Sequence, residues 1–243
     1  MNLIHRAFRI ALPQVKNLAI ILSTISLLAV GCSQSICGKR HNFTPQEGDL
    51  LFQDLDCGPI CDAIEKVTIG YHGANFSHVG IVAKDDDNLV VIEASSNGVQ
   101  ATQLQDFLNR SFDANHQPKV VVGRLKHPFR HLIPLALKQA AALKGRPYDK
   151  EFVINNEAYY CSELIYEIFL RANNNRPVFK LQPMTFKDPD TKTAFPAWQE
   201  YFSKLGAPIP ESQPGINPGS ISRSPLLTII YAYGTPSGWE NEP

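Results

Sequence analysis

The chain has 243 residues, of which 44% are hydrophobic and 19% are charged, and its 23 Lys and Arg residues balance its 23 Asp and Glu residues. This length and composition indicate one globular domain that can bury its own core. Without a surplus of positive charge to neutralise phosphates, the chain is not expected to bind nucleic acid.

Residues 1–31 are expected to be a signal peptide. Arg6, Arg9 and Lys16 precede a mainly apolar run over residues 18–30, and residues 1–31 contain no acidic residue. A run of 13 residues is shorter than the roughly 20 that a membrane-spanning helix needs, and it suits the core of a signal peptide.

The end of this run, LAVGC at residues 28–32, resembles a bacterial lipobox. The resemblance implies cleavage before Cys32 and a lipid on its thiol, which would tether the protein to a membrane that it does not span. Ser33 at the next position implies an outer-membrane lipoprotein that faces the periplasm. The alternative is an ordinary secretory signal followed by an incidental cysteine.

After the signal, residues 32–46 are expected to be the lipidated cysteine and a polar tether, residues 47–235 one α+β domain, and residues 236–243 a tail. The expected elements are, in chain order, a strand in 48–54, one or two helical turns in 60–68, strands 77–84, 89–95 and 120–125, helices 132–143 and 161–172, an extended covering loop over 177–224, and a last buried strand or helix over 226–233.

The strands on either side of residues 85–88 (DDDN) are expected to pair as a β-hairpin. A turn at these residues places Gly80 opposite Glu93. Because side chains alternate along a strand, His78 and Glu93 then lie diagonally on one face, and Gly80 leaves room between them. A carboxylate that hydrogen-bonds one imidazole nitrogen fixes the tautomer, so the other nitrogen can act as a base.

A candidate nucleophile begins the predicted helix over residues 161–172. The first-turn N–H groups and the dipole of a helix stabilise a negatively charged sulfur, which suits Cys161 for thiol chemistry. Cys161, His78 and Glu93 together have the residue types needed for acyl transfer through a thioester. The spacing alone does not bring Cys161 to the hairpin.

Five short motifs, taken in their order, resemble the YiiX/YebB-like branch of the NlpC/P60 superfamily, the circularly permuted papain-like cysteine hydrolases. They are GDLLFQD (48–54), NFSHVGIV (75–82), VIEAS (91–95), GRPYD (145–149) and YYCSELIY (159–166). The resemblance covers about residues 46–233 and implies an antiparallel sheet packed against helices, with the histidine strand before the cysteine helix.

The same resemblance implies roles for individual residues. Cys161 would be the nucleophile, His78 the base and acid, and Glu93 the residue that orients the imidazole. Tyr148 and Tyr160 would lie near the cleft as substrate contacts. No cofactor and no metal are implied.

These expectations describe an envelope-anchored cysteine hydrolase that cleaves an amide or related acyl bond, with cell-wall peptide as the leading substrate class. One alternative is a thiol acyltransferase or lipid hydrolase of the type related to lecithin:retinol acyltransferase. Another is a catalytically silent module that binds envelope components.

The remaining cysteines allow several interpretations. Cys57 and Cys61, with His72 and His78 downstream, could suggest zinc, but this spacing lacks a second regular pair of ligands. In an oxidising periplasm a disulfide is at least as plausible. A Cys57–Cys61 bridge, a bridge from Cys37 to either of them, or no bridge are all compatible with the sequence.

Overall fold

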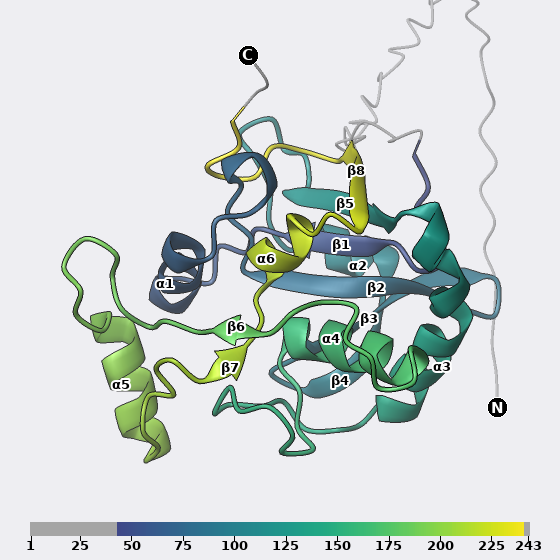
Figure 1. Ribbon diagram of the computed structural model, residues 1–243. Helices are drawn as coiled ribbons and strands as arrows, with labels where there is room; N and C mark the ends of the chain where they lie inside the picture. Colours follow the sequence, from purple (N-terminus) through teal and green to yellow (C-terminus); the bar gives the residue numbers. More distant parts are fainter. Residues whose placement is uncertain (1–42, 241–243) are drawn as a thin grey trace, which may run out of the picture. The chain divides into compact units, whose positions relative to one another are not determined.

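The structure is a computed structural model that describes residues 43–240 (Figure 1). The predicted signal peptide, Cys32, Cys37 and most of the predicted tether lie outside the described residues. Within residues 43–240, no helix combines the length and the apolar character that crossing a membrane requires.

A six-stranded antiparallel sheet with the strand order β4-β3-β2-β1-β5-β8 organises the described residues. A separate pair, β6 and β7, lies outside it. The strands are β1 Leu50–Gln53, β2 His78–Asp85, β3 Asn88–Ser95, β4 Gly98–Gln103, β5 Val120–Leu125, β6 Gln182–Pro183, β7 Pro214–Gly215 and β8 Leu227–Ala232.

Helices are distributed along the chain and pack on the sheet and on one another, so the architecture is α+β, as predicted. The α-helices are α1 Pro59–Val67, α2 Leu104–Leu108, α3 Ile133–Leu143, α4 Cys161–Ala172, α5 Pro196–Leu205 and α6 Pro218–Ser222, and the 3-10 helices are η1 Tyr71–Gly73 and η2 His127–Leu132.

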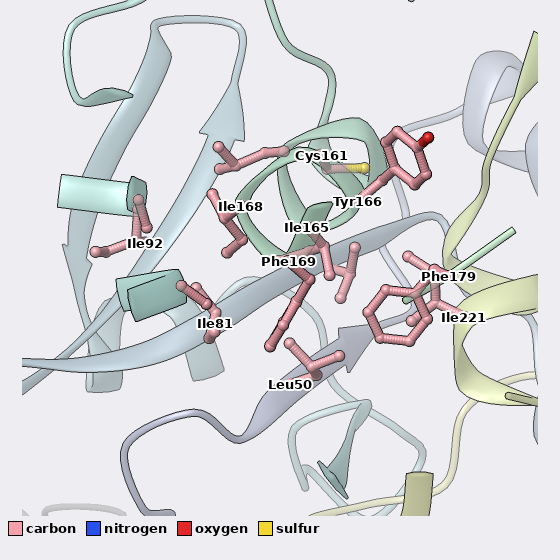
Figure 2. Close-up of a cluster of buried hydrophobic side chains, with 14 of the residues drawn as sticks. Leu50, Ile81, Ile92, Cys161, Ile165, Tyr166, Ile168, Phe169, Phe179 and Ile221 are labelled. Atoms are coloured by element: carbon pink, nitrogen blue, oxygen red, sulfur yellow. The ribbon is translucent and has the colours of Figure 1, made fainter. Parts of the chain in front are cut away.

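The alternation of side chains divides the apolar residues of the sheet between two clusters. Leu50 belongs to the larger cluster, in which the apolar side of α4 packs against β2 and β3 (Figure 2). Its neighbour Leu51 belongs to a second cluster, which contains Phe107 of α2. Cys161 belongs to the larger cluster and lies at the first turn of α4.

The Glu163 carboxylate caps the start of α4. Tyr160 is the extended N-cap residue, and its backbone N–H donates to Oε2 of Glu163, three residues later, at 3.4 Å. The buried side chains Leu164, Ile165 and Ile168 follow at helical spacing. Cys161 is therefore the first residue of a helix whose orientation is set by buried contacts.

The prediction of an extended covering loop over residues 177–224 was wrong. This stretch contains α5 and α6 as well as β6 and β7. Within α5, Trp198 and Phe202 lie four residues apart and are both buried, so they face one side of a helix. Gly206 ends α5 in the left-handed conformation, at φ 72°.

Two other segments differ from expectation. Residues 226–233 contain a strand, β8, but it is an edge strand and its side chains are mostly only half-buried. The strand β4 and the helix α2 were not predicted from the sequence. The predicted tether reaches into the fold, because the ring of Phe43 stacks on Tyr231 of β8 with the centroids 4.2 Å apart.

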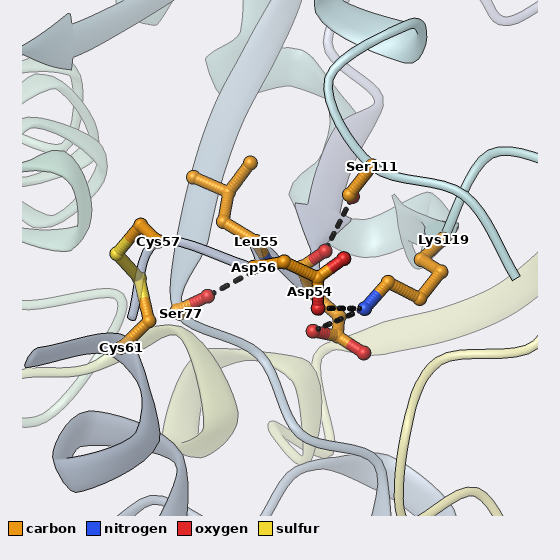
Figure 3. Close-up of a disulfide and its surroundings, with 8 residues drawn as sticks. All are labelled: Asp54, Leu55, Asp56, Cys57, Cys61, Ser77, Ser111 and Lys119. Atoms are coloured by element: carbon orange, nitrogen blue, oxygen red, sulfur yellow. Dashed lines mark hydrogen bonds and ion pairs between the residues drawn. A yellow bond between two sulfur atoms is a disulfide. The ribbon is translucent and has the colours of Figure 1, made fainter. Parts of the chain in front are cut away.

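A disulfide joins Cys57 to Cys61 at the start of α1 (Figure 3), which selects one of the pairings that the sequence left open. Asp54 and Asp56 lie between β1 and this disulfide in the sequence. Lys119 forms ion pairs with both, at 3.0 Å with Asp54 and at 2.6 Å with Asp56. Among the cysteines within residues 43–240, Cys161 is the one with a free thiol.

Candidate active site

The hairpin register is the one predicted from the turn. The partners run from Ile81 and Ile92 to Asp85 and Asn88, the residues that close the turn. With this register His78 Nε2 donates a hydrogen bond to Oε2 of Glu93, and the two atoms are 2.6 Å apart.

Gly80 is necessary for this approach. A Cβ atom at position 80 would lie 2.4 Å from Cγ1 of Val91 and 3.3 Å from Cβ of Glu93. The first distance is shorter than any normal contact between these carbons, so even alanine at this position would push against the strand that holds the carboxylate.

The Glu93 carboxylate is completely buried and has hydrogen-bond donors on both oxygens. His78 and Arg110 donate to Oε2, while Thr102 and Arg110 donate to Oε1. Burial by itself raises the pKa of a carboxyl group, but the hydrogen bonds from Arg110, His78 and Thr102 outweigh it and hold the pKa of Glu93 well below its usual value. Glu93 is therefore ionised at neutral pH.

The imidazole of His78 connects Glu93 to Cys161. Its Nε2 is bonded to Glu93, so its other ring nitrogen, Nδ1, is the one left for the Cys161 thiol. Burial lowers the pKa of His78, but the hydrogen bonds with Cys161 and Glu93 outweigh it and raise the pKa to about 9. The structure thus brings together three side chains that lie 15 and 68 positions apart along the sequence.

Cys161 lines a cavity of about 180 Å³ between α1, α4, α5 and the β6–β7 pair. The residue is 7% exposed, as is His78. His78 and Glu93 are not among the lining residues, so a ligand in the cavity would meet the sulfur first.

Both tyrosines predicted as substrate contacts line this cavity, but their surroundings differ. The hydroxyl of Tyr160 accepts a hydrogen bond from the backbone N–H of Ile216 at 3.1 Å, which ties α4 to the β7–α6 segment. Within residues 43–240, the Tyr148 hydroxyl has no hydrogen-bond partner in the protein. Burial, and then the neighbouring Cys161, raise the pKa of Tyr148, so it is a neutral donor.

The segment between Tyr148 and Tyr160 adds a further wall of the cavity. Asp149 accepts hydrogen bonds from the backbone N–H groups of Glu151 and Val153, at 2.8 and 2.7 Å. This turn holds Phe152 in the left-handed region at φ 57°. The Phe152 ring then contacts an aromatic group made of Tyr148, Tyr160, Phe186, Trp198, Tyr201 and Phe202.

Arg110 and Thr102 were not predicted from the sequence as residues of the site. Thr102 lies on β4, which was not predicted, and Arg110 follows α2 in a polar segment without a motif. One signal was available for Thr102, since β4 continues β3 through the two residues Ser96 and Asn97, a hairpin spacing. No comparable signal marks Arg110.

The model of the C92 peptidase family, described as permuted papain-like amidases of the YaeF/YiiX type, matches residues 44–231. YiiX of Escherichia coli strain K12 is 23% identical over 188 residues, which are 76% of this chain and 86% of YiiX.

A crystal structure described as that of the metalloprotein YiiX from Escherichia coli O157:H7 superposes with a TM-score of 0.61 at 23% identity, and the match covers 79% of this chain and 99% of that one. This likeness shows the fold. The match to the family model spans most of the chain and includes the hairpin and the cysteine helix. The chain therefore belongs to the permuted papain-like amidases of the C92 family and is a cysteine hydrolase.

Proposed function

We propose that Cys161 is the nucleophile of this hydrolase, that His78 is its base and acid, and that Glu93 orients the imidazole. The observation that supports these roles is that His78 bonds to the ionised Glu93 through Nε2 while Cys161, which lines the cavity, lies near enough to raise the pKa of His78. The proposed reaction is cleavage of an amide or related acyl bond through a thioester.

In the first half of the reaction, the sulfur attacks the substrate carbonyl as a thiolate beside the His78 imidazolium, which is the form present at neutral pH because the pKa of His78 is about 9. The tetrahedral intermediate then collapses to a thioester, and the imidazolium gives its proton to the leaving amine. In the second half, His78 takes a proton from water, which attacks the thioester and releases the acid and the free thiol.

Two donors are available for the negative oxygen of the intermediate. Cys161 is the first residue of α4, so its backbone N–H has no carbonyl of the same helix to which it could donate a hydrogen bond. The Tyr148 hydroxyl lines the same cavity and is the second candidate donor. Donors fixed in advance at a developing oxyanion are a large part of catalysis in acyl transfer.

The cavity lining favours a substrate with an apolar group next to the scissile bond. Phe152, Phe186 and Trp198 face the cavity together with Met184. Among the described residues that line it, Arg223 is the one charged residue. We therefore propose an N-acyl amide with an apolar acyl group as the substrate class that this lining suits best.

Cell-wall peptide is the second candidate, and polar residues at the β6–β7 side support it. Gln182, Asn217 and Arg223 could bind peptide groups and a carboxylate there. The envelope location is also a proposal: a lipid on Cys32 would tether the domain to the outer membrane, facing the periplasm.

The proposed mechanism uses no metal. The related YiiX structure is described as a metalloprotein, which raises the question of whether the side chains near Cys161 could bind a metal ion. Cys161 and Nδ1 of His78 would offer two ligands, and within residues 43–240 no group of three or more His, Cys, Asp or Glu side chains could hold an ion. These residues do not fit a metal centre, and no step is assigned to one.

The test is a mass-spectrometric screen of N-acyl amides and cell-wall peptides with the wild-type protein and with Cys161→Ala. We expect cleavage of the N-acyl amides, loss of cleavage in the variant, and an acyl adduct of Cys161 when the reaction is quenched early. An added amine or alcohol tests for transfer to an acceptor other than water. Cleavage of peptides alone would overturn the proposed substrate class, and cleavage by Cys161→Ala would overturn the proposed nucleophile.

A further inference from the structure

Arg110 is a charged residue at the site to which the proposed mechanism assigns no role. Its side chain is 27% exposed, whereas the Glu93 side chain that it contacts is 0% exposed. Nη1 donates to Oε2 of Glu93 at 2.7 Å, and Nη2 donates to Oε1. Both ends of the guanidinium are therefore engaged by one carboxylate, the geometry in which arginine binds carboxylates most specifically.

Phe107 helps to fix this arrangement. The guanidinium carbon of Arg110 lies 5.0 Å from the centroid of the Phe107 ring, within the range of a cation–π contact. The same ring lies 5.8 Å from the ring of His78 and is fully buried. Arg110 and His78 therefore pack against one rigid aromatic side chain while both bond to Glu93.

A role of Arg110 in substrate binding does not fit these contacts. Its two terminal nitrogens already bond to Glu93, and it is not among the residues that line the cavity at Cys161. Arg223, by contrast, lines that cavity and has no ion-pair partner within residues 43–240.

We propose that Arg110 is a positioning residue whose fixed charge keeps Glu93 ionised, so that Nε2 of His78 donates to Glu93 and Nδ1 stays available to Cys161. The proposal rests on the roles proposed above for Cys161 and His78. Arg110 itself touches neither the sulfur nor a ligand in the cavity; it acts through the carboxylate.

The loss of Arg110 would have two consequences. A buried carboxylate without a counter-charge tends to take up a proton, and a protonated Glu93 can donate to Nε2. The imidazole would then carry its proton on Nδ1 and could not accept the proton of the thiol. In addition, removing a permanent positive charge makes every proton in the cluster harder to lose.

Alkylation of Cys161 by iodoacetamide tests this proposal without knowledge of the substrate. The rate is measured on the full-length chain from pH 4 to 9 by mass spectrometry of the peptide that contains Cys161. For Arg110→Met we expect the acid limb of the profile to move up by roughly one pH unit, which is about a tenfold lower rate on that limb. Arg110→Lys keeps the charge and is expected to return the profile most of the way to that of wild type.

Arg124→Met is the matched control. Arg124 forms a similar two-bond pair with the buried Asp49, with both distances at 2.7 Å, and lies outside the catalytic residues. Its loss should lower thermal stability by a similar amount and leave the alkylation profile unchanged. A profile of Arg110→Met that also matches wild type, with only stability reduced, would overturn the proposal and leave Arg110 a structural residue.

Failure of the proposed function would look different. In that case wild-type Cys161 would react no faster than an ordinary exposed thiol, and His78→Ala would not change its rate. This result would overturn the positioning role together with the roles of Cys161 and His78, whereas a fast wild-type reaction with an unshifted Arg110→Met profile would overturn the positioning role alone.

Discussion

The raised pKa of His78 predicts a specific dependence of stability on pH. In the folded protein the pKa of His78 is about 9, against an ordinary value of 6.5. Because the folded protein holds this proton more tightly than the unfolded chain, the resulting stabilisation is complete below pH 6.5. It is lost as the pH rises through 9.

The magnitude follows from the size of the shift. Each pKa unit corresponds to about 1.4 kcal/mol, so the shift corresponds to about 3 kcal/mol of unfolding free energy between pH 6.5 and pH 9. That is a large fraction of the total stability of a typical domain, about 5–15 kcal/mol. Urea-unfolding curves therefore have enough resolution to detect it.

The measurement compares wild type with His78→Gln in urea from pH 6 to 10, without reductant. Glutamine keeps a donor for Glu93 but does not titrate. The pH dependence of wild-type stability also contains contributions from two other groups, because burial raises the pKa of Glu65 to about 7 and that of Glu163 to about 8. Both remain in the variant, so the difference between the two curves reports on His78 together with its partner Cys161.

We expect the stability advantage of wild type over His78→Gln to shrink by about 3 kcal/mol between pH 6 and 10. His127→Gln replaces an exposed histidine and should follow wild type at every pH. A difference between wild type and His78→Gln that stays constant within about 0.5 kcal/mol across this range would refute the reasoning, because it would mean that folding does not change the proton affinity of His78.

Three further predictions concern single substitutions. Gly80→Ala should lower the unfolding free energy by about 1–3 kcal/mol, since its Cβ would crowd the strand that carries Glu93; thermal unfolding measures this, and an unchanged midpoint would contradict it. Tyr148→Phe should lower kcat roughly a hundredfold with little change in KM if the hydroxyl stabilises the oxyanion, whereas Tyr201→Phe, whose hydroxyl bonds a backbone carbonyl at 2.9 Å, should leave kcat unchanged. Cys32→Ala should move the protein from the membrane to the soluble fraction, and continued membrane binding would rule out the lipid anchor.

Much of the site geometry could be predicted because it follows from local rules. Once the turn at residues 85–88 is placed, strand alternation determines that Glu93 lies diagonally across from His78. The position of Cys161 follows from the apolar spacing of the residues after it. Bringing Cys161 to the hairpin required the family resemblance, because no local rule relates segments so far apart in the sequence.

The prediction of an extended loop over residues 177–224 was wrong for a different reason. Its high content of Pro and Gly suggested an extended loop, yet Pro196 occupies the first turn of α5 and Gly206 its end, the positions where these residues favour a helix boundary. The helical spacing of Trp198 and Phe202 was readable in the sequence. The role of Arg110 could not be predicted from the sequence. A single arginine in a polar segment acquires its partner only when β3 and the residues after α2 meet in the folded chain.

Because of the Cys57–Cys61 disulfide, the redox conditions of purification can affect any activity assay of this protein. The disulfide closes a short loop at the beginning of α1, and the later residues Ile64 and Val67 of that helix form part of the cavity wall at Cys161. Protein purified from a reducing cytosol would have this loop open, so the helix would be less firmly held beside Cys161. Reductants added to protect Cys161 carry the same risk, and the oxidation state of both thiols should be established before a substrate is judged inactive.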